Sequence, residues 1–419
     1  MAGHRLSGDF WKFWTGQTIS NLGSSFTFFA LPLLVFKLAG SAVNLALTTA
    51  AYFIPYLLFG LVIGAVVDRV DRKRLMIAVD LGRAAVIASI PAFAAADALS
   101  VWWIYAVSFL VATLTIAFDS GEFAAIPSLV DRDDLVTANG RIMASYQGAT
   151  FAGPILAGAL VGGGLSIEYV LLVDGASFIA SAVSLAAVRS SFNAPPDPNR
   201  QPTSLRRDVA EGLRYVFSHP VLRNISIMMA LFNFVGTTSL TQLVFFAKER
   251  LGASDSEVGF LFSAGSAGVV VLSLAAGPIR RKLPFSVAAL GALMLYGLLT
   301  VVFALTETFW VALPLWALIM GLGLFFNVNT QSLRQAIVPS HMLGRVVSVA
   351  GVLAWSAIPL GALFGGWLID LTDDVALVYA LVGIVTFLIA FSFRFTALGH
   401  AEDFVEDRPE AEPAAQPAG

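Results

Sequence analysis

Twelve stretches of the chain are long and apolar enough to cross a lipid bilayer, and they limit the fold more than any other feature. A membrane-spanning helix needs about 20 apolar residues, whereas a transmembrane β-barrel shows alternating segments of about ten residues. The sequence therefore predicts an all-α integral membrane protein with 12 transmembrane helices. The expected spans are residues 13–36, 42–67, 75–96, 98–118, 142–167, 169–188, 224–247, 258–279, 283–306, 308–333, 346–369 and 375–393.

The composition excludes several other classes of protein. Apolar residues make up 57% and charged residues 13% of the chain, while soluble proteins are about a quarter charged. The absence of cysteine excludes disulfides, thiolate metal sites and thiol catalysis. The four histidines form no metal-ligand pattern, and a net charge of −3 gives no reason to expect nucleic acid as a partner. We expect no metal and no cofactor.

The positive charges predict the orientation, because cytoplasmic loops retain Lys and Arg. With both termini in the cytoplasm, only Lys37, Lys248 and Arg250 of the 25 Lys and Arg fall outside. The N-terminal "FWKFW" is typical of an interfacial aromatic anchor, and no small-residue cleavage site follows the first span. We expect a multi-pass membrane protein with both termini in the cytoplasm.

The longest internal hydrophilic stretch divides the chain into two halves. Residues 1–188 and 223–396 each hold six expected spans, and residues 189–222 form a cytoplasmic linker with an amphipathic helix near 205–217. The acidic, Pro- and Ala-rich residues 397–419 are expected to be a disordered cytoplasmic tail.

Weak internal repeats relate these halves. Arg141 precedes Pro154 much as Arg345 precedes Pro359, and Gly64 has an echo in Gly277. Two related, pseudo-symmetric halves around a central cavity are typical of alternating-access transporters.

A charged loop after the second span carries a family resemblance. Gly64-x-x-x-Asp68-Arg69-x-x-Arg72-Lys73 resembles motif A, the loop 2–3 signature of the major facilitator superfamily, with Asp71 in place of the usual glycine. "GQTISNLGSSFTFFALPLLVF", "DGASFIASA" and "GLGLFFNVNTQSLRQAIVPSHMLGRVVSV" are similar to bacterial exporters of the macrolide-efflux and enterobactin-exporter type.

The resemblance implies a conformational latch in this loop. Asp68 would meet the N-terminus of helix 11 near residues 344–347, and Arg72 would pair with Asp119 or Glu122 at the end of helix 4. A solvated loop that only sets topology is the alternative. The latch residues are Gly64, Asp68, Arg69, Arg72, Lys73, Asp119 and Glu122.

A second resemblance concerns helix 5, which carries a pattern similar to motif C of drug/proton antiporters. Small residues at this spacing let two helices approach closely, and the proline bends the helix; the alternative is the ordinary abundance of Gly and Pro in membrane helices. The residues are Gly140, Ala149, Gly153, Pro154, Ala157 and Gly158.

Acids within the membrane are candidates for proton or ion coupling, because burying them in lipid is costly. Asp174, Asp119 and Glu122 are the candidates, although a structural hydrogen-bonding role for Asp174 stays open. Asp80 and Arg83, three residues apart, are expected to pair with one another.

Isolated polar residues in apolar spans are candidates for a substrate cavity, and interhelical hydrogen bonding is the alternative for them. Gln17, Asn21 and Ser24 share one face of helix 1. The full set is Gln17, Asn21, Ser24, Asn233, Gln242, Asn327, Asn329 and Gln331.

These features together indicate a secondary active transporter that is not an enzyme and not an ATP-driven pump. The leading interpretation is a monomeric, proton-coupled exporter of amphipathic small molecules such as drugs, macrolides or siderophores. The alternatives are an importer or metabolite carrier of the same fold, and a membrane sensor that does not transport.

Overall fold

The computed structural model describes residues 6–67, 70–130, 134–193, 205–280, 283–338 and 340–406. Nearly all of these residues are helical, and no strand occurs among them. Asp68 and Arg69 lie outside the described residues, so their predicted roles stay predictions.

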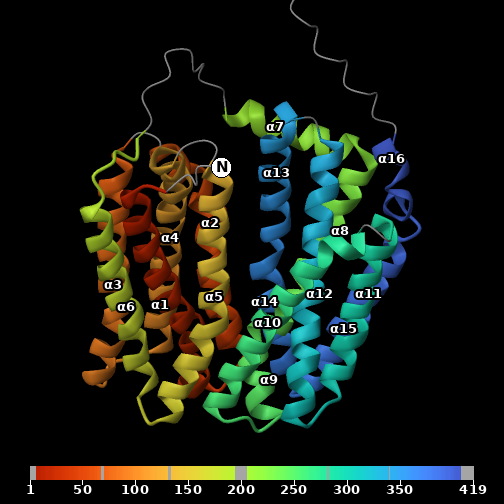
Figure 1. Ribbon diagram of the computed structural model, residues 1–419. Coiled ribbons are helices and arrows are strands. Elements are labelled where there is room, and N and C mark those ends of the chain that lie inside the picture. Colours follow the sequence, from red (N-terminus) through yellow and green to blue (C-terminus); the bar gives the residue numbers. More distant parts are fainter. Residues whose placement is uncertain are drawn as a thin grey trace, which may run out of the picture.

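Two helical halves stand side by side, joined through the linker helix α7 (Leu205–Ser218) at one end of the molecule (Figure 1). The N half consists of α1 (Gly8–Ala39), α2 (Ala42–Val67), α3 (Arg72–Ala95), α4 (Val101–Leu129), α5 (Leu135–Gly162) and α6 (Ile167–Ala187). The C half consists of α8 (Pro220–Thr241), α9 (Leu243–Glu249), α10 (Asp255–Arg280), η2 (Ser286–Leu290), α11 (Gly291–Ala304), α12 (Phe309–Ile337), α13 (Ser340–Trp355), α14 (Ala357–Thr372), α15 (Val375–Phe393), η3 (Ala397–His400) and α16 (Asp403–Glu406).

The helices confirm a multi-pass membrane protein. Among the described residues, 11 helical segments are long and apolar enough to cross a membrane. The expected span 142–167 falls mostly in α5, which is not one of them, so a total of 12 stays a prediction. The seventh and eleventh expected spans are each interrupted, at Gln242 between α8 and α9 and at Ser356 between α13 and α14.

Small residues allow close helix packing within each half. A Cβ atom on Gly268 of α10 would collide with the backbone oxygen of Ala317 in α12. The two backbones therefore touch, which favours association in lipid, where apolar surface alone gives no driving force between helices.

A buried ion pair joins the middle of the N half. Arg83 forms an ion pair with Asp80, and both side chains are almost fully buried. The guanidinium also lies over two rings, 4.3 Å from the centroid of Phe118 and 4.2 Å from that of Phe178. The predicted pairing of Asp80 with Arg83 is thus confirmed.

The first part of the expected disordered tail is folded. Leu398 and Ala401 are fully buried, and the Glu402 carboxylate accepts a hydrogen bond of 2.9 Å from the backbone N–H of Ser286. The prediction of disorder from residue 397 is wrong up to residue 406, because these apolar side chains pack against the C half. Residues 407–419 lie outside the described residues.

The two halves meet at the end opposite α7, which we call the far end; the end that carries α7 is the linker end (Figure 1). The carboxylate of Asp255 at the start of α10 binds Lys37 of α1 at 2.5 Å and Lys248 of α9 at 2.6 Å. Lys37 belongs to the N half, so this carboxylate bridges the halves.

Helices α5 and α10 form the main contact between the halves. A Cβ atom on Gly259 of α10 would lie 2.5 Å from the backbone oxygen of Pro154, and Gly158 lies against the same glycine. Ser256 donates to the Gly158 carbonyl at 3.0 Å. The two backbones are therefore in direct contact here.

Helices α2 and α14 form a second contact at the far end. Ser41, just before α2, donates to Asp370 of α14 at 3.2 Å. The buried Gln242, between α8 and α9, donates to the Ala42 carbonyl at the start of α2 at 2.8 Å. Toward the linker end, Tyr56 of α2 meets Trp355 of α13 edge-on at 6.1 Å. Ser266 of α10 also donates to the Thr150 carbonyl of α5 at 3.0 Å, nearer the middle of the two helices.

The buried ion pair predicts a large loss of stability for Asp80→Ala. Removing one partner leaves a buried charge uncompensated, which costs about 3–5 kcal/mol. Thermal unfolding of the purified protein in detergent should show a clearly lower midpoint for Asp80→Ala.

The exposed Arg74–Asp71 pair supplies the matched control, because solvated pairs contribute little. Arg74→Ala should unfold at the native temperature, and Asp80→Ala with Arg83→Met should recover most of the loss. Equal midpoints for Asp80→Ala and Arg74→Ala would contradict the role given to the buried pair.

The far-end contact predicts a disulfide between cysteines placed at 162 and 256. A Cβ atom on Gly162 would lie 3.5 Å from the Cβ of Ser256, which suits a disulfide. The chain has no cysteine of its own, so Gly162→Cys with Ser256→Cys should cross-link under mild oxidation.

Mass spectrometry of proteolytic fragments measures the cross-link, and each single cysteine variant is the control. A double variant that stays reduced under conditions that oxidise a surface cysteine pair would contradict the contact.

Candidate functional site

A residue of the charged loop before α3 caps the start of that helix. Asp71 is the N-cap residue of α3, and its carboxylate accepts a hydrogen bond of 3.0 Å from the Arg74 backbone N–H. An aspartate at this position satisfies a free amide of the first turn. This capping explains why Asp71 is suitable where the family signature usually has glycine.

Two basic residues of the loop bind the segment that follows α6. Arg72 donates from its guanidinium to the Phe192 carbonyl at 3.2 Å, and Lys73 donates to the Val188 carbonyl. The described contacts do not pair Arg72 with Asp119 or Glu122. The predicted latch belongs to a state closed on the cytoplasmic side, so this pairing stays a prediction. The surroundings of Gly64 lie outside the described residues.

α4 carries two acids three residues apart, and the first of them, Asp119, lies near tyrosines of α2 and α5. Asp119 is exposed and Glu122 is half-buried, and the charge of Asp119 acts on Tyr52, Tyr56 and Tyr146. Neither carboxylate has a hydrogen bond or ion pair within the described part of the chain. Because α2 and α5 also contact the C half, these acids lie beside the boundary between the halves.

The small residues of α5 pack against two different helices, α1 and α10. A Cβ atom on Gly153 would collide with the Ser25 side chain of α1, whereas Gly158 lies against α10. Ala149 and Ala157 are buried. A close approach of helices is thus seen at Gly153 and Gly158, whereas at Gly140 an added Cβ atom would meet nothing within 4 Å.

Asp174 of α6 is 1% exposed and faces α1. Its carboxylate accepts hydrogen bonds from Thr27 at 2.5 Å, Ser24 at 3.2 Å and Ser177 at 3.3 Å. The site is a single carboxylate surrounded by three hydroxyl groups.

The predicted cavity face of α1 is wrong for two of its three residues. Gln17 is buried and donates to Ser181 of α6 at 3.1 Å. Ser24 donates to Asp174, which is also in α6. Both residues hold α1 to α6. Asn21 is half-buried and has no hydrogen bond within the described residues.

Several polar candidates of the C half also act between or within helices. Asn233 donates to the Ala354 carbonyl at 2.9 Å, and Gln242 forms the far-end contact given above. The buried Asn329 donates to the Phe325 carbonyl of its own helix at 2.7 Å. Asn327 is exposed and Gln331 half-buried, so these two still suit a cavity.

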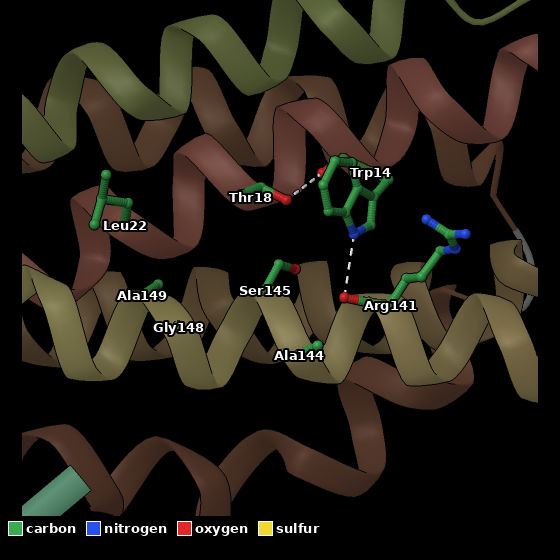
Figure 2. Close-up of a pocket in the computed structure, with 8 residues that line it drawn as sticks. All are labelled: Trp14, Thr18, Leu22, Arg141, Ala144, Ser145, Gly148 and Ala149. Carbon is green, nitrogen blue, oxygen red and sulfur yellow. Dashed lines mark hydrogen bonds between the residues drawn. The ribbon is translucent and has the colours of Figure 1, made fainter. Parts of the chain in front are cut away.

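A groove of about 530 Å³ lies between α1 and α5, a volume suited to a small-molecule ligand (Figure 2). Trp14 donates from its indole N–H to the Arg141 carbonyl at 3.1 Å, and the Arg141 guanidinium lies 4.8 Å from the ring centroid of Trp11. The lining residues are Trp14, Thr18, Leu22, Arg141, Ala144, Ser145, Gly148 and Ala149.

Two sequence features already contain residues that form this groove. "FWKFW" predicted an interfacial anchor, and its second tryptophan, Trp14, lines the groove instead. The small residues Ala144, Gly148 and Ala149 recur on one face of α5 and leave the space that the groove occupies.

Comparison of the sequence with known families and proteins agrees with this architecture. A model of the Major Facilitator Superfamily matches residues 13–359 and, in an overlapping match, 243–418. The multidrug efflux pump Tap of Mycolicibacterium fortuitum is 28% identical over 363 residues, which cover 83% of this chain and 86% of that protein. Macrolide efflux protein A of Streptococcus pyogenes is 24% identical over 369 residues, covering 86% and 89%.

Solved structures share the fold at lower identity. A bacterial homologue of the human lysosomal transporter Spinster, solved in an inward-facing and unoccupied conformation, has a TM-score of 0.74 at 17% identity and covers 96% of this chain and 98% of its own. The nucleoside transporter NupG has a TM-score of 0.76 at 14% identity, covering 94% and 99%. The two-half helical fold and the family match together place this chain in the Major Facilitator Superfamily.

Proposed function

We propose that the protein is a proton-coupled secondary transporter that exports amphipathic small molecules across the bacterial cytoplasmic membrane by alternating access. The observation that carries the proposal is the position of the contacts between the halves. The bridging contacts of Asp255, Gly259 and Gln242 all lie toward the far end. A transporter closed on one side of its cargo site has contacts arranged in this way.

The far end is proposed to face the outside, with the linker end and both termini in the cytoplasm. The three cations that this orientation leaves outside are all ion-paired. Lys37 and Lys248 share Asp255, and Arg250 pairs with Glu307 at 2.9 Å. The orientation rests on the small number of these cations, because Lys and Arg are retained on the cytoplasmic side.

The groove between α1 and α5 supports amphipathic cargo. Its lining is mainly apolar, with a few hydroxyl groups and the Arg141 guanidinium. Such a surface suits a lipophilic body with sparse polar groups better than a sugar or a small ion. The names of the efflux relatives point in the same direction, and we propose that this chain acts as a monomer without a cofactor.

Import is the second candidate, because the fold is shared with a nucleoside transporter. A sensor without transport activity is the third. The direction of movement separates the first two, and the absence of movement identifies the third.

Export is tested in an efflux-deficient bacterial host. Cells that express the protein should accumulate less ethidium, Hoechst 33342 or erythromycin than cells with an empty vector. A protonophore should remove the difference, because the proton gradient supplies the energy.

The oxidised double variant Gly162→Cys with Ser256→Cys is the matched control. It should export nothing while its disulfide holds the far end closed, and reduction should restore export. Greater accumulation in expressing cells would favour import, and no change for any compound tried would contradict export of this class.

A further inference from the structure

Asp174 is a deeply buried acid at the contact between α1 and α6, and within the described residues no Lys or Arg forms an ion pair with it. α6 packs against α1, α3 and α5. Among the described residues, Arg83 of α3 is the one charged group whose field reaches Asp174, and Arg83 is already paired with Asp80. No titratable group of α1 or α5 acts on this carboxylate.

The surroundings of Asp174 suit both states of a carboxyl group. A hydroxyl group can donate to a carboxylate or accept from a carboxylic acid, and Thr27, Ser24 and Ser177 provide three of them. An uncompensated carboxylate in a dry site is costly, and binding one proton removes that cost.

A continuous series of close contacts connects Asp174 with the far end. A Cβ atom on Gly23 of α1 would lie 2.9 Å from the Cα of Asp174. Two residues further along α1, Ser25 is in contact with Gly153 of α5, and the next residue, Pro154, lies against Gly259 of α10. Coupling between distant sites is carried by packed elements of this kind.

We infer that Asp174 is the residue that binds the transported proton, and that its protonation favours closure of the far end. This inference rests on the proposed function. Proton uptake converts the carboxylate to a neutral acid, so α1 and α6 can pack as closely as they do in the structure. Loss of the proton leaves a charge that must be hydrated, which moves α1 and weakens its support of the α5–α10 contact.

The inference is tested without any cargo by measuring the far-end opening as a function of pH. Spin labels on Leu165→Cys, in the turn before α6, and Leu305→Cys, after α11, report the distance between the halves at the far end in liposomes. Both positions are exposed. The distance should be short at low pH and should lengthen as the pH rises.

Asp174→Asn should remove this dependence and keep the short distance at every pH, because the amide stays neutral. Thr27→Val should move the midpoint of the transition upward by about one pH unit, since it removes a hydrogen bond to the charged form. Glu168→Gln, another acid of α6, is the matched control and should leave the midpoint in place.

A native transition that persists in Asp174→Asn, or a Thr27→Val midpoint equal to the native one, would overturn the inference. A distance that never changes with pH in the native protein would overturn it as well. Failure of the export test with an intact pH response would contradict the proposed function and leave the proton site standing, so the two failures can be told apart.

Discussion

The close approach of α5 and α10 is the interaction on which the rest of the structure depends. In lipid, apolar side chains gain nothing by leaving their surroundings, so helices associate through close backbone contact and hydrogen bonds. Gly158 and Gly259 provide the first, and Ser256 provides the second. The ion bridge at Asp255 adds a charged link between the halves at this end, beside the hydrogen bonds of Gln242 and Ser41. Contacts near one end of the two halves are the arrangement on which the proposed alternating-access function rests.

The general architecture could be predicted from the sequence because it depends on local properties. Span length, charge-free composition and the hydrophilic linker each report on a continuous segment, and the two halves followed from them. The pairing of Asp80 with Arg83 was predictable for the same reason, because residues three apart on a helix lie on one face. The cap formed by Asp71 is equally local, but the family signature has a glycine at this position and therefore does not indicate a capping aspartate.

The polar face of α1 shows what the sequence could not provide. Periodicity placed Gln17 and Ser24 together, but it did not say whether that face meets a cavity or another helix. The small residues on the same face held the missing information: Gly16 and Gly23 fit against Ser184 and Ser177 of α6. A face that combines glycines with amides and hydroxyls favours a tight helix contact over a water-filled space. The folded start of the C-terminal tail was missed because its acidic composition outweighed its few buried apolar residues.

Thiol accessibility from each side of the membrane tests the central claim, that the halves are closed at the far end and accessible from the linker end. The absence of native cysteine allows single reporters at Tyr146, which is half exposed, and at Gln242, which is fully buried. With the 162–256 disulfide formed, a membrane-impermeant maleimide should label Tyr146→Cys from the cytoplasmic side and should not reach Gln242→Cys from outside. Labelling of Gln242→Cys from outside in the cross-linked protein, or of Tyr146→Cys only from outside, would contradict the account.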